Sequence, residues 1–236
     1  MENQTVARAL TEQLGLDMPP VALAFCDAPP LGVGSPGAAA PSACAFWRDA
    51  ERGVFFAPVD AHANCPVGAF VMGFELKPAL MQELQGLIGQ MSACGYVNAD
   101  ETGKIPTNRR KAKGILYGRL DQFPQAPDAV LAWLTARQAM LWGEASGGAA
   151  WTAAAPSAVL GRPACAAIPV AIDRGVPTLS LGCMGMRTFT RIGDDRLLAV
   201  IPGAKLGAFT LAIGRAAAIN QGMQSFYEGR LAGLDG

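Results

Sequence analysis

Apolar residues follow two patterns along this chain, stripes at helical spacing and short unbroken runs. Val6, Leu10 and Leu14 recur at helical spacing, which predicts a helix over residues 3–14. The run from Val21 to Phe25 is typical of a buried strand. The same patterns predict further helices at residues 77–93, 135–145 and 204–227, and further strands at residues 54–57, 178–181 and 197–201. Strands that alternate with helices indicate an α/β or α+β fold.

Two stretches of the sequence, separated by about half the chain, resemble each other. The first holds Cys44 and Cys65 on either side of an Arg-Gly pair, and the second holds Cys165 and Cys183 around another Arg-Gly pair. If the two copies are related by a pseudo-twofold axis, the two cysteine pairs face each other.

A weaker similarity lies upstream of each stretch, between residues 20–25 and residues 129–134. A duplicated unit predicts two pseudo-symmetric halves of about 120 residues, packed into one globular unit. We place the first half at residues 1–120 and the second at residues 121–236.

The local sequence predicts where each cysteine sits. Ser42 is a suitable cap for a helix that carries Cys44 on its first turn and ends at Gly53. Cys165 begins a second helix, which ends near Gly175. The other cysteine of each stretch falls in a loop between a strand and the next helix.

Composition excludes several classes of protein. With 19 basic and 19 acidic residues the formal net charge is zero, so no field attracts nucleic acid or an anionic membrane. The sequence shows no signal peptide and no apolar run of about 20 residues that could span a bilayer. We expect a cytoplasmic protein, whose cysteines are free, metal-bound or catalytic. Motifs of zinc hydrolases, P-loop NTPases and GxGxxG dehydrogenases are missing from the sequence.

Four thiolates from the two cysteine pairs form the ligand set of an iron–sulfur cluster or of zinc. Glycines beside them let backbone N–H groups approach sulfur or a cofactor closely, and Gly68, Gly182 and Gly185 are the candidates. The two methionines that follow Cys183 make Cu(I) a further alternative. Free thiols that pack as small hydrophobic groups are the structural alternative, and they are also the expectation for Cys26 and Cys94.

Two other side chains are candidates for catalysis. His62 is the only histidine and stands three positions before Cys65, where it could donate a proton to a substrate or a hydrogen bond to a cluster. Arg187 follows the Cys183 loop and could bind an anionic substrate. Its structural alternative is a salt bridge with Asp194 or Asp195.

Several of these motifs together resemble the uncharacterised "domain of unknown function 169" family. The resemblance runs from about residue 18 to residue 215. It is carried by Pro19-Pro20-Val21-Ala22, Cys44, Cys65-Pro66-Val67-Gly68-Ala69, Gln138-Ala139-Met140, Cys165 and Ser180-Leu181-Gly182-Cys183-Met184-Gly185-Met186-Arg187. Family members occur largely in archaea and in anaerobic or metabolically versatile bacteria, an association consistent with an iron–sulfur protein. The family implies no activity.

The leading hypothesis is a cytoplasmic redox protein or small-molecule reductase that holds one [4Fe-4S] cluster between its halves by Cys44, Cys65, Cys165 and Cys183. A binding module for a small molecule or soft metal is one alternative. A thiol enzyme with Cys183 or Cys65 as nucleophile is the other. The expected partner is a small-molecule substrate or a redox partner protein, and a homodimer is left open.

Overall fold

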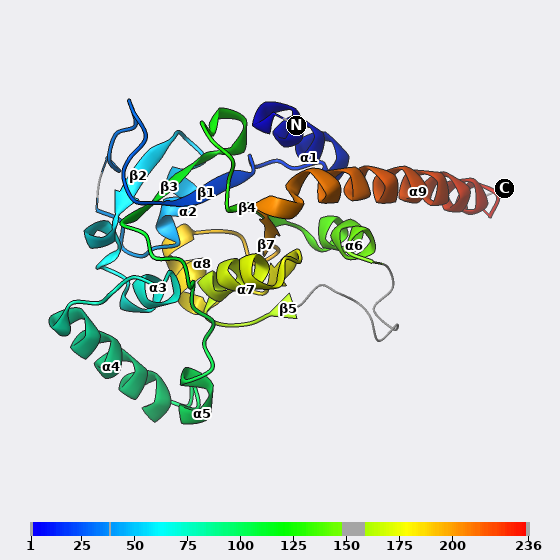
Figure 1. The fold of residues 1–236 in the computed structure, drawn as a ribbon. Coiled ribbons are helices and arrows are strands. Elements are labelled where there is room, and N and C mark those ends of the chain that lie inside the picture. Colours follow the sequence, from blue (N-terminus) through cyan, green and yellow to red (C-terminus); the bar gives the residue numbers. More distant parts are fainter. Residues whose placement is uncertain (1, 38, 148–158, 235–236) are drawn as a thin grey trace.

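One seven-stranded sheet forms the centre of the molecule in a computed structural model, which describes residues 2–37, 39–147 and 159–234 (Figure 1). The strands are β1 (Val21–Cys26), β2 (Phe55–Pro58), β3 (Gly114–Arg119), β4 (Ala129–Leu134), β5 (Val159–Leu160), β6 (Thr178–Ser180) and β7 (Leu197–Pro202). They lie in the order β2-β3-β1-β4-β7-β6-β5. All neighbours are antiparallel except β5 and β6, which are parallel. Together with the helices, this sheet confirms the expected α/β or α+β class.

The two strands at the centre of the sheet come from the two similar segments upstream of the cysteines. β1 pairs with β4, with Val21 opposite Leu131. The order then reads β3-β2 outward from β1 and β7-β6 outward from β4. In both sets the chain visits the central strand first, the outer strand second and the middle strand last, which is the order that a duplication would produce. A twofold axis between the halves, and their division at residue 120, stay predictions.

Helices cover both faces of the sheet. They are α1 (Asn3–Leu14), α2 (Ala45–Asp49), α3 (Pro66–Val71), α4 (Pro78–Ala93), α5 (Ala99–Thr102), α6 (Ala136–Ala145), α7 (Ala167–Arg174), α8 (Met184–Thr190) and α9 (Leu206–Ala232). Short 3-10 turns are η1 (Val59–His62), η2 (Leu120–Gln122), η3 (Ala164–Ala166) and η4 (Gly203–Lys205). Across the described ranges, every helix is too short or too polar to cross a bilayer.

Alternate residues of the central strands supply two separate cores. Ala22 and Ala24 of β1 belong to the core shared with α1, α6 and α9. Leu23 and Phe25 belong to the opposite core, shared with α2, α3, α7 and α8. Because side chains of a strand point alternately to the two faces, strands covered on both sides are apolar at every position. This explains the unbroken runs in the sequence, and it leaves one helix layer on each side of the sheet.

Two helix ends test the local predictions. α7 ends at Gly175 in the left-handed conformation, with φ of 61°, as predicted. The predicted helix from Ser42 to Gly53 is wrong at both ends, because α2 covers only Ala45–Asp49 and Ala50 closes it in a right-handed conformation. The residue at its N-cap position is Cys44, not Ser42.

Candidate functional site

The four cysteines of the two pairs lie on elements that cover the same face of the sheet. Cys44, Cys65 and Cys183 directly precede α2, α3 and α8, and Cys165 lies in η3, which leads into α7. Two of these cysteines come from the first half of the chain and two from the second. Cys44 and Cys165 are buried in the core on this face, and Cys183 packs half-buried against it. We call these four residues the cysteine site.

Charge effects between the thiols show that the four cysteines are neighbours. Burial raises the pKa of Cys165 well above the ordinary thiol value, and the charges of Cys65, Cys183 and Cys44 raise it further. Burial also raises the pKa of Cys44 to about 12, opposed by a hydrogen bond with Ser42 and reinforced by the charges of Cys65 and Cys183. Such mutual effects need sulfur atoms close together in a poorly solvated place. The structure therefore brings together the four cysteines that the internal repeat singled out.

Backbone N–H groups hold two of the sulfur atoms. The Cys65 Sγ accepts a hydrogen bond from Gly68 N–H at 3.3 Å, and the Cys183 Sγ accepts one from Met186 N–H at 3.4 Å. Each sulfur caps the helix that follows it, in the way that serine or aspartate oxygens usually do. These bonds fix the two sulfur positions, and N–H donors of this kind stabilise a thiolate.

The three candidate glycines have different surroundings. An added Cβ at Gly68 would lie 2.6 Å from the Ala43 Cβ and 3.0 Å from the Cys65 Sγ, so this close approach requires glycine. Gly182 has a φ of +87°, and a Cβ there would lie 2.5 Å from the Met186 Cε; its N–H donates to the Ser180 hydroxyl. Gly185 lies in open space, where a Cβ would meet only the Phe189 ring at 4.0 Å. Of the three, Gly68 is the one whose N–H reaches a cysteine sulfur.

The cysteine site does not have the geometry of a single-ion centre. Within the described residues, no group of three or more His, Cys, Asp or Glu side chains could hold a metal ion. Four thiolates around one zinc ion would each lie about 2.3 Å from a common point. A [4Fe-4S] cluster spreads its thiolates over four different irons, so its ligands stand farther apart than those of one ion. Within the described residues, the four thiols are therefore neighbours that do not converge on a single ion.

The single histidine is buried and hydrogen-bonded to Tyr117. Its Nδ1 lies 3.0 Å from the Pro58 carbonyl oxygen and its Nε2 lies 3.1 Å from the Tyr117 hydroxyl. A carbonyl oxygen can only accept, so Nδ1 of His62 carries the hydrogen and Nε2 accepts from the tyrosine. Burial lowers the pKa of His62 to about 4, which keeps the ring neutral near pH 7. Both ring nitrogens are thus engaged inside the protein.

Tyr117 is a site residue that the sequence did not indicate. It is fully buried on β3, and burial raises the pKa of its hydroxyl, followed by the charges of Cys165, Cys44 and Cys65. The Tyr117 hydroxyl therefore lies beside the thiols while it donates to His62. The only signal in the sequence was one tyrosine in a short apolar run. Such tyrosines are too common in proteins to identify one of them as a site residue.

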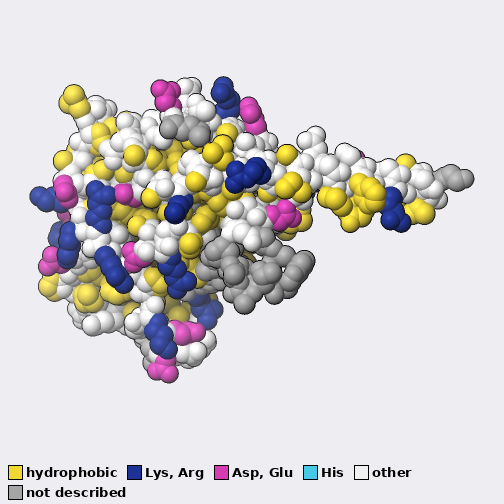
Figure 2. All heavy atoms as spheres, turned by 45° about the vertical axis from the view of Figure 1, so that its right-hand side comes forward, with side chains coloured by type: hydrophobic (Ala, Val, Ile, Leu, Met, Phe, Trp, Pro, Cys, Tyr) yellow, Lys and Arg dark blue, Asp and Glu magenta, His cyan; other side chains and the backbone are white. Residues whose placement is uncertain are grey.

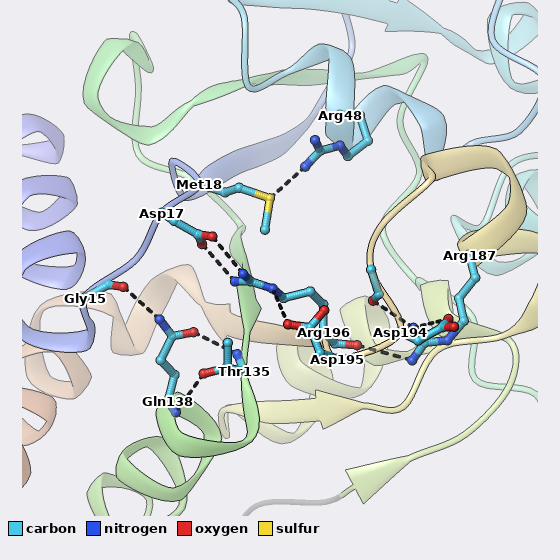
Figure 3. Close-up of polar contacts among 11 residues, drawn as sticks. Gly15, Asp17, Met18, Arg48, Thr135, Gln138, Arg187, Asp194, Asp195 and Arg196 are labelled. Atoms are coloured by element: carbon cyan, nitrogen blue, oxygen red, sulfur yellow. Dashed lines mark hydrogen bonds and ion pairs between the residues drawn. The ribbon is translucent and has the colours of Figure 1, made fainter.

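Arg187 binds the backbone of its own loop. Figure 3 shows its guanidinium turned toward the chain that follows α8. Its Nη2 donates to the carbonyl oxygens of Leu181 at 2.8 Å and Arg196 at 3.2 Å, and its Nη1 donates to that of Gly193 at 3.2 Å. The pair with Asp194 is long, at 3.8 Å, and the aspartate is fully exposed. Arg187 therefore holds this loop in place, and its use as an anion ligand stays a prediction.

The two remaining cysteines have separate surroundings. Cys26 ends β1, where the Gln125 amide lies 3.5 Å from its sulfur. Cys94 is exposed at the end of α4. Neither is among the thiols whose charge raises the pKa of Cys44 or Cys165. Cys94 is thus not packed as a small hydrophobic group, and a structural role for the two cysteines stays a prediction.

Comparison with known proteins identifies the family but no activity. No curated protein and no solved structure matches the chain. The family model of domain of unknown function 169, described as "Uncharacterised ArCR", matches residues 9–210, a range that includes the whole cysteine site. This match covers most of the sequence, and the chain therefore belongs to the domain of unknown function 169 family.

Proposed function

We propose that the cysteine site binds a [4Fe-4S] cluster and that the protein is a cytoplasmic redox protein. The observation that carries the proposal is geometric: four cysteines from four different elements gather on one face of the sheet, and backbone N–H groups donate to two of the sulfurs. Buried thiols stay protonated by themselves, and they ionise together only when a positively charged group lies between them. An iron–sulfur cluster supplies that positively charged group, and the thiols lose their protons as the metal binds.

The residues present fit such a cluster. Four cysteines can supply all four ligands, and the N–H groups of Gly68 and Met186 already point at the sulfurs of Cys65 and Cys183. When bound, the cluster would supply one-electron transfer. The protein's own part is to hold the four sulfurs, to keep water from Cys44 and Cys165, and to stabilise the charge by N–H donors.

Electron transfer to a partner protein is favoured over reduction of a small molecule. Three of the five N–H donors of Arg187 are used by backbone carbonyls, and both nitrogens of His62 are used by Pro58 and Tyr117. His62 is therefore not free to hold a substrate, and Arg187 is held largely by its own loop. The residues around Cys183 instead include the exposed apolar side chains of Leu181, Met184 and Phe189, which suit a transient protein contact. Small-molecule reduction is the alternative within the same proposal.

A thiol enzyme is the main alternative outside it. A cysteine nucleophile needs a lowered pKa, whereas burial and neighbouring charges raise the pKa of both Cys44 and Cys165. These two thiols are protonated and unreactive near neutral pH in the absence of a metal. A nucleophile in the cysteine site would have to be one of its two half-buried members, as the sequence hypothesis stated for Cys183 and Cys65.

The test is an absorption spectrum of protein purified without oxygen, with iron and sulfide analysis. We expect a broad band near 400 nm that dithionite bleaches, and about four irons per chain. Cys165→Ser should lose the iron, whereas the matched control Cys94→Ser, at the exposed end of α4, should keep it. A colourless protein without iron after anaerobic reconstitution would overturn the proposal, and zinc bound in its place would favour the soft-metal alternative.

A further inference from the structure

The second half of α9 extends away from the rest of the molecule. Its buried residues all lie in the first half of the helix, the last being Ala216, whereas residues 221–234 are all exposed. Figure 1 shows this part as the orange and red helix that leaves the body, and Figure 2 shows hydrophobic side chains gathered on it. From residue 217 to residue 232 the helix is about 24 Å long.

The apolar side chains of this extension lie on one side. Ile219, Met223, Phe226, Tyr227 and Leu231 recur at spacings of three and four residues, and each is between 45% and 67% exposed. This spacing places them on one face of the helix, which we call the α9 stripe. The start of the extension bonds to α6, from Arg137 to Gln224 and from Asn220 to Glu144, whereas its apolar side chains stay exposed. Such a helix is marginal in water, since packing of an apolar face supplies most helix stability in proteins. The stripe therefore calls for a partner surface.

A hollow beside the helix continues the stripe. It has a volume of about 1090 Å³ and lies between α1, α6 and α9. Its walls include Leu14 of α1 and Met140 and Leu141 of α6, together with Met223 and Tyr227 of the stripe. Met140 is 49% exposed at this place. One molecule thus offers both an extended apolar helix and an apolar hollow into which such a helix can pack.

We propose that the α9 stripe pairs with a second copy of this chain, with the two helices antiparallel. In this arrangement the tip of each helix packs into the hollow of the other copy, and a twofold axis lets both hollows be filled at once. An aromatic side chain buries about 150–250 Å² when it is fully covered. The side chains of one stripe are about half exposed, so covering all five buries on the order of 500 Å². The hollow adds the rest of the roughly 800 Å² per copy that stable interfaces bury.

The charge of the extension favours a second copy over a membrane surface. Between residues 217 and 232 the only side chains that are charged near pH 7 are Glu228 and Arg230. Helices that lie on anionic membranes carry several lysines or arginines on their polar face, and this one does not. Two neutral stripes also meet without charge repulsion. The pairing is independent of the cysteine site, which lies on the opposite face of the sheet.

The test is the solution mass of the full chain by light scattering after size exclusion, across a range of concentrations. We expect twice the chain mass of 24.5 kDa for the unmodified protein. Phe226→Glu, within the stripe, should weaken the pairing at least tenfold. Ser225→Glu is the matched control, because it places the same charge on the next residue, outside the stripe. Circular dichroism checks that both variants fold.

A second variant tests the hollow. Met140→Glu should weaken the pairing by a similar factor, because the tip of the partner's helix packs there. A monomeric unmodified protein at high micromolar concentration would overturn the proposal, whether or not the protein then binds phosphatidylcholine or phosphatidylglycerol vesicles. So would equal dimer affinity of Phe226→Glu and Ser225→Glu. Equal affinity of Met140→Glu and the unmodified chain would overturn the antiparallel arrangement.

Discussion

The cysteine site has an inner pair of sulfurs and an outer pair. Cys44 and Cys165 form the inner pair; both are buried in the core that faces the sheet. Cys65 and Cys183 form the outer pair; both are half-buried, and each accepts an N–H bond from the first turn of the helix that it caps. Each half of the chain supplies one inner and one outer cysteine, in the same order.

The difference indicates a division of roles. The inner sulfurs lie where an isolated thiolate is costly, so they become charged only if a metal group compensates them. The outer sulfurs are held by backbone donors and are partly exposed. Under the proposed function, the inner pair decides whether a cluster binds, and the side of the outer pair is the path for electrons to a partner.

The largest expected effect is a difference in iron content between variants in which an inner or an outer cysteine is replaced by serine. Cys165→Ser should remove nearly all iron from anaerobically purified protein, because a buried hydroxyl is a poor ligand and its anion is costly in a poorly solvated place. Cys183→Ser should keep a measurable fraction of the iron, since serine still caps α8 and its oxygen stays in place. Iron per chain is the measurement. Equal loss in the two variants would contradict the distinction between inner and outer sulfurs.

The next effect concerns the glycines beside the outer pair. Gly68→Ala should destabilise the protein by about 1–3 kcal/mol, because its Cβ would meet Ala43 and push the Cys65 sulfur. Gly182→Ala should cost a similar amount, since φ of +87° strains any other residue. Gly185→Ala is the control and should be neutral or slightly stabilising inside α8. Chemical unfolding measures all three, and a Gly185→Ala cost as large as the others would refute this account.

Sequence patterns were sufficient for the features that depend on local spacing or on the repeat. The unbroken run in β1 and the left-handed end of α7 at Gly175 are confirmed. The proximity of the four cysteines was predicted from the repeat, and all four lie on elements that cover the same face of the sheet. Metal binding by these cysteines does not follow from the sequence and stays a prediction.

Features that depend on distant contacts could not be predicted. Strand β3 escaped notice because Gly114 and Gly118 interrupt its apolar pattern. A Cβ at Gly114 would lie 2.4 Å from the Phe56 ring, and one at Gly118 would lie 2.7 Å from a Val54 methyl carbon. The glycines are therefore required by residues about 60 positions away, which no local pattern reveals. The place of Tyr117 at the site depends on this same strand.

A smaller effect on stability is expected at Tyr117, which lies beside the inner pair. The Tyr117 hydroxyl is affected by the charges of both inner cysteines and of Cys65, and it donates to His62. Tyr117→Phe leaves the His62 Nε2 without its donor in a buried place, which should cost about 1–2 kcal/mol of unfolding free energy. Tyr227→Phe, on an exposed ring, should cost close to nothing. Equal stability of the two variants would show that the bond between Tyr117 and His62 does not stabilise the fold.

The smallest effect lies at the loop that follows the outer Cys183. Arg196, whose carbonyl oxygen accepts from Arg187, binds Asp17 through two hydrogen bonds of 2.8 and 2.7 Å (Figure 3). This hydrogen bond lowers the pKa of Asp17 below its usual 3.8. A lowered carboxyl pKa means that the contribution to stability is present above about pH 4 and is lost as the pH falls through the folded-state pKa. Asp17→Asn should therefore cost less than about 1 kcal/mol at pH 7, since the pair is exposed, and the difference from the unmodified protein should vanish near pH 2. Unfolding free energies at the two pH values test this, and a difference that persists at pH 2 would assign the effect of Asp17 to packing instead of charge.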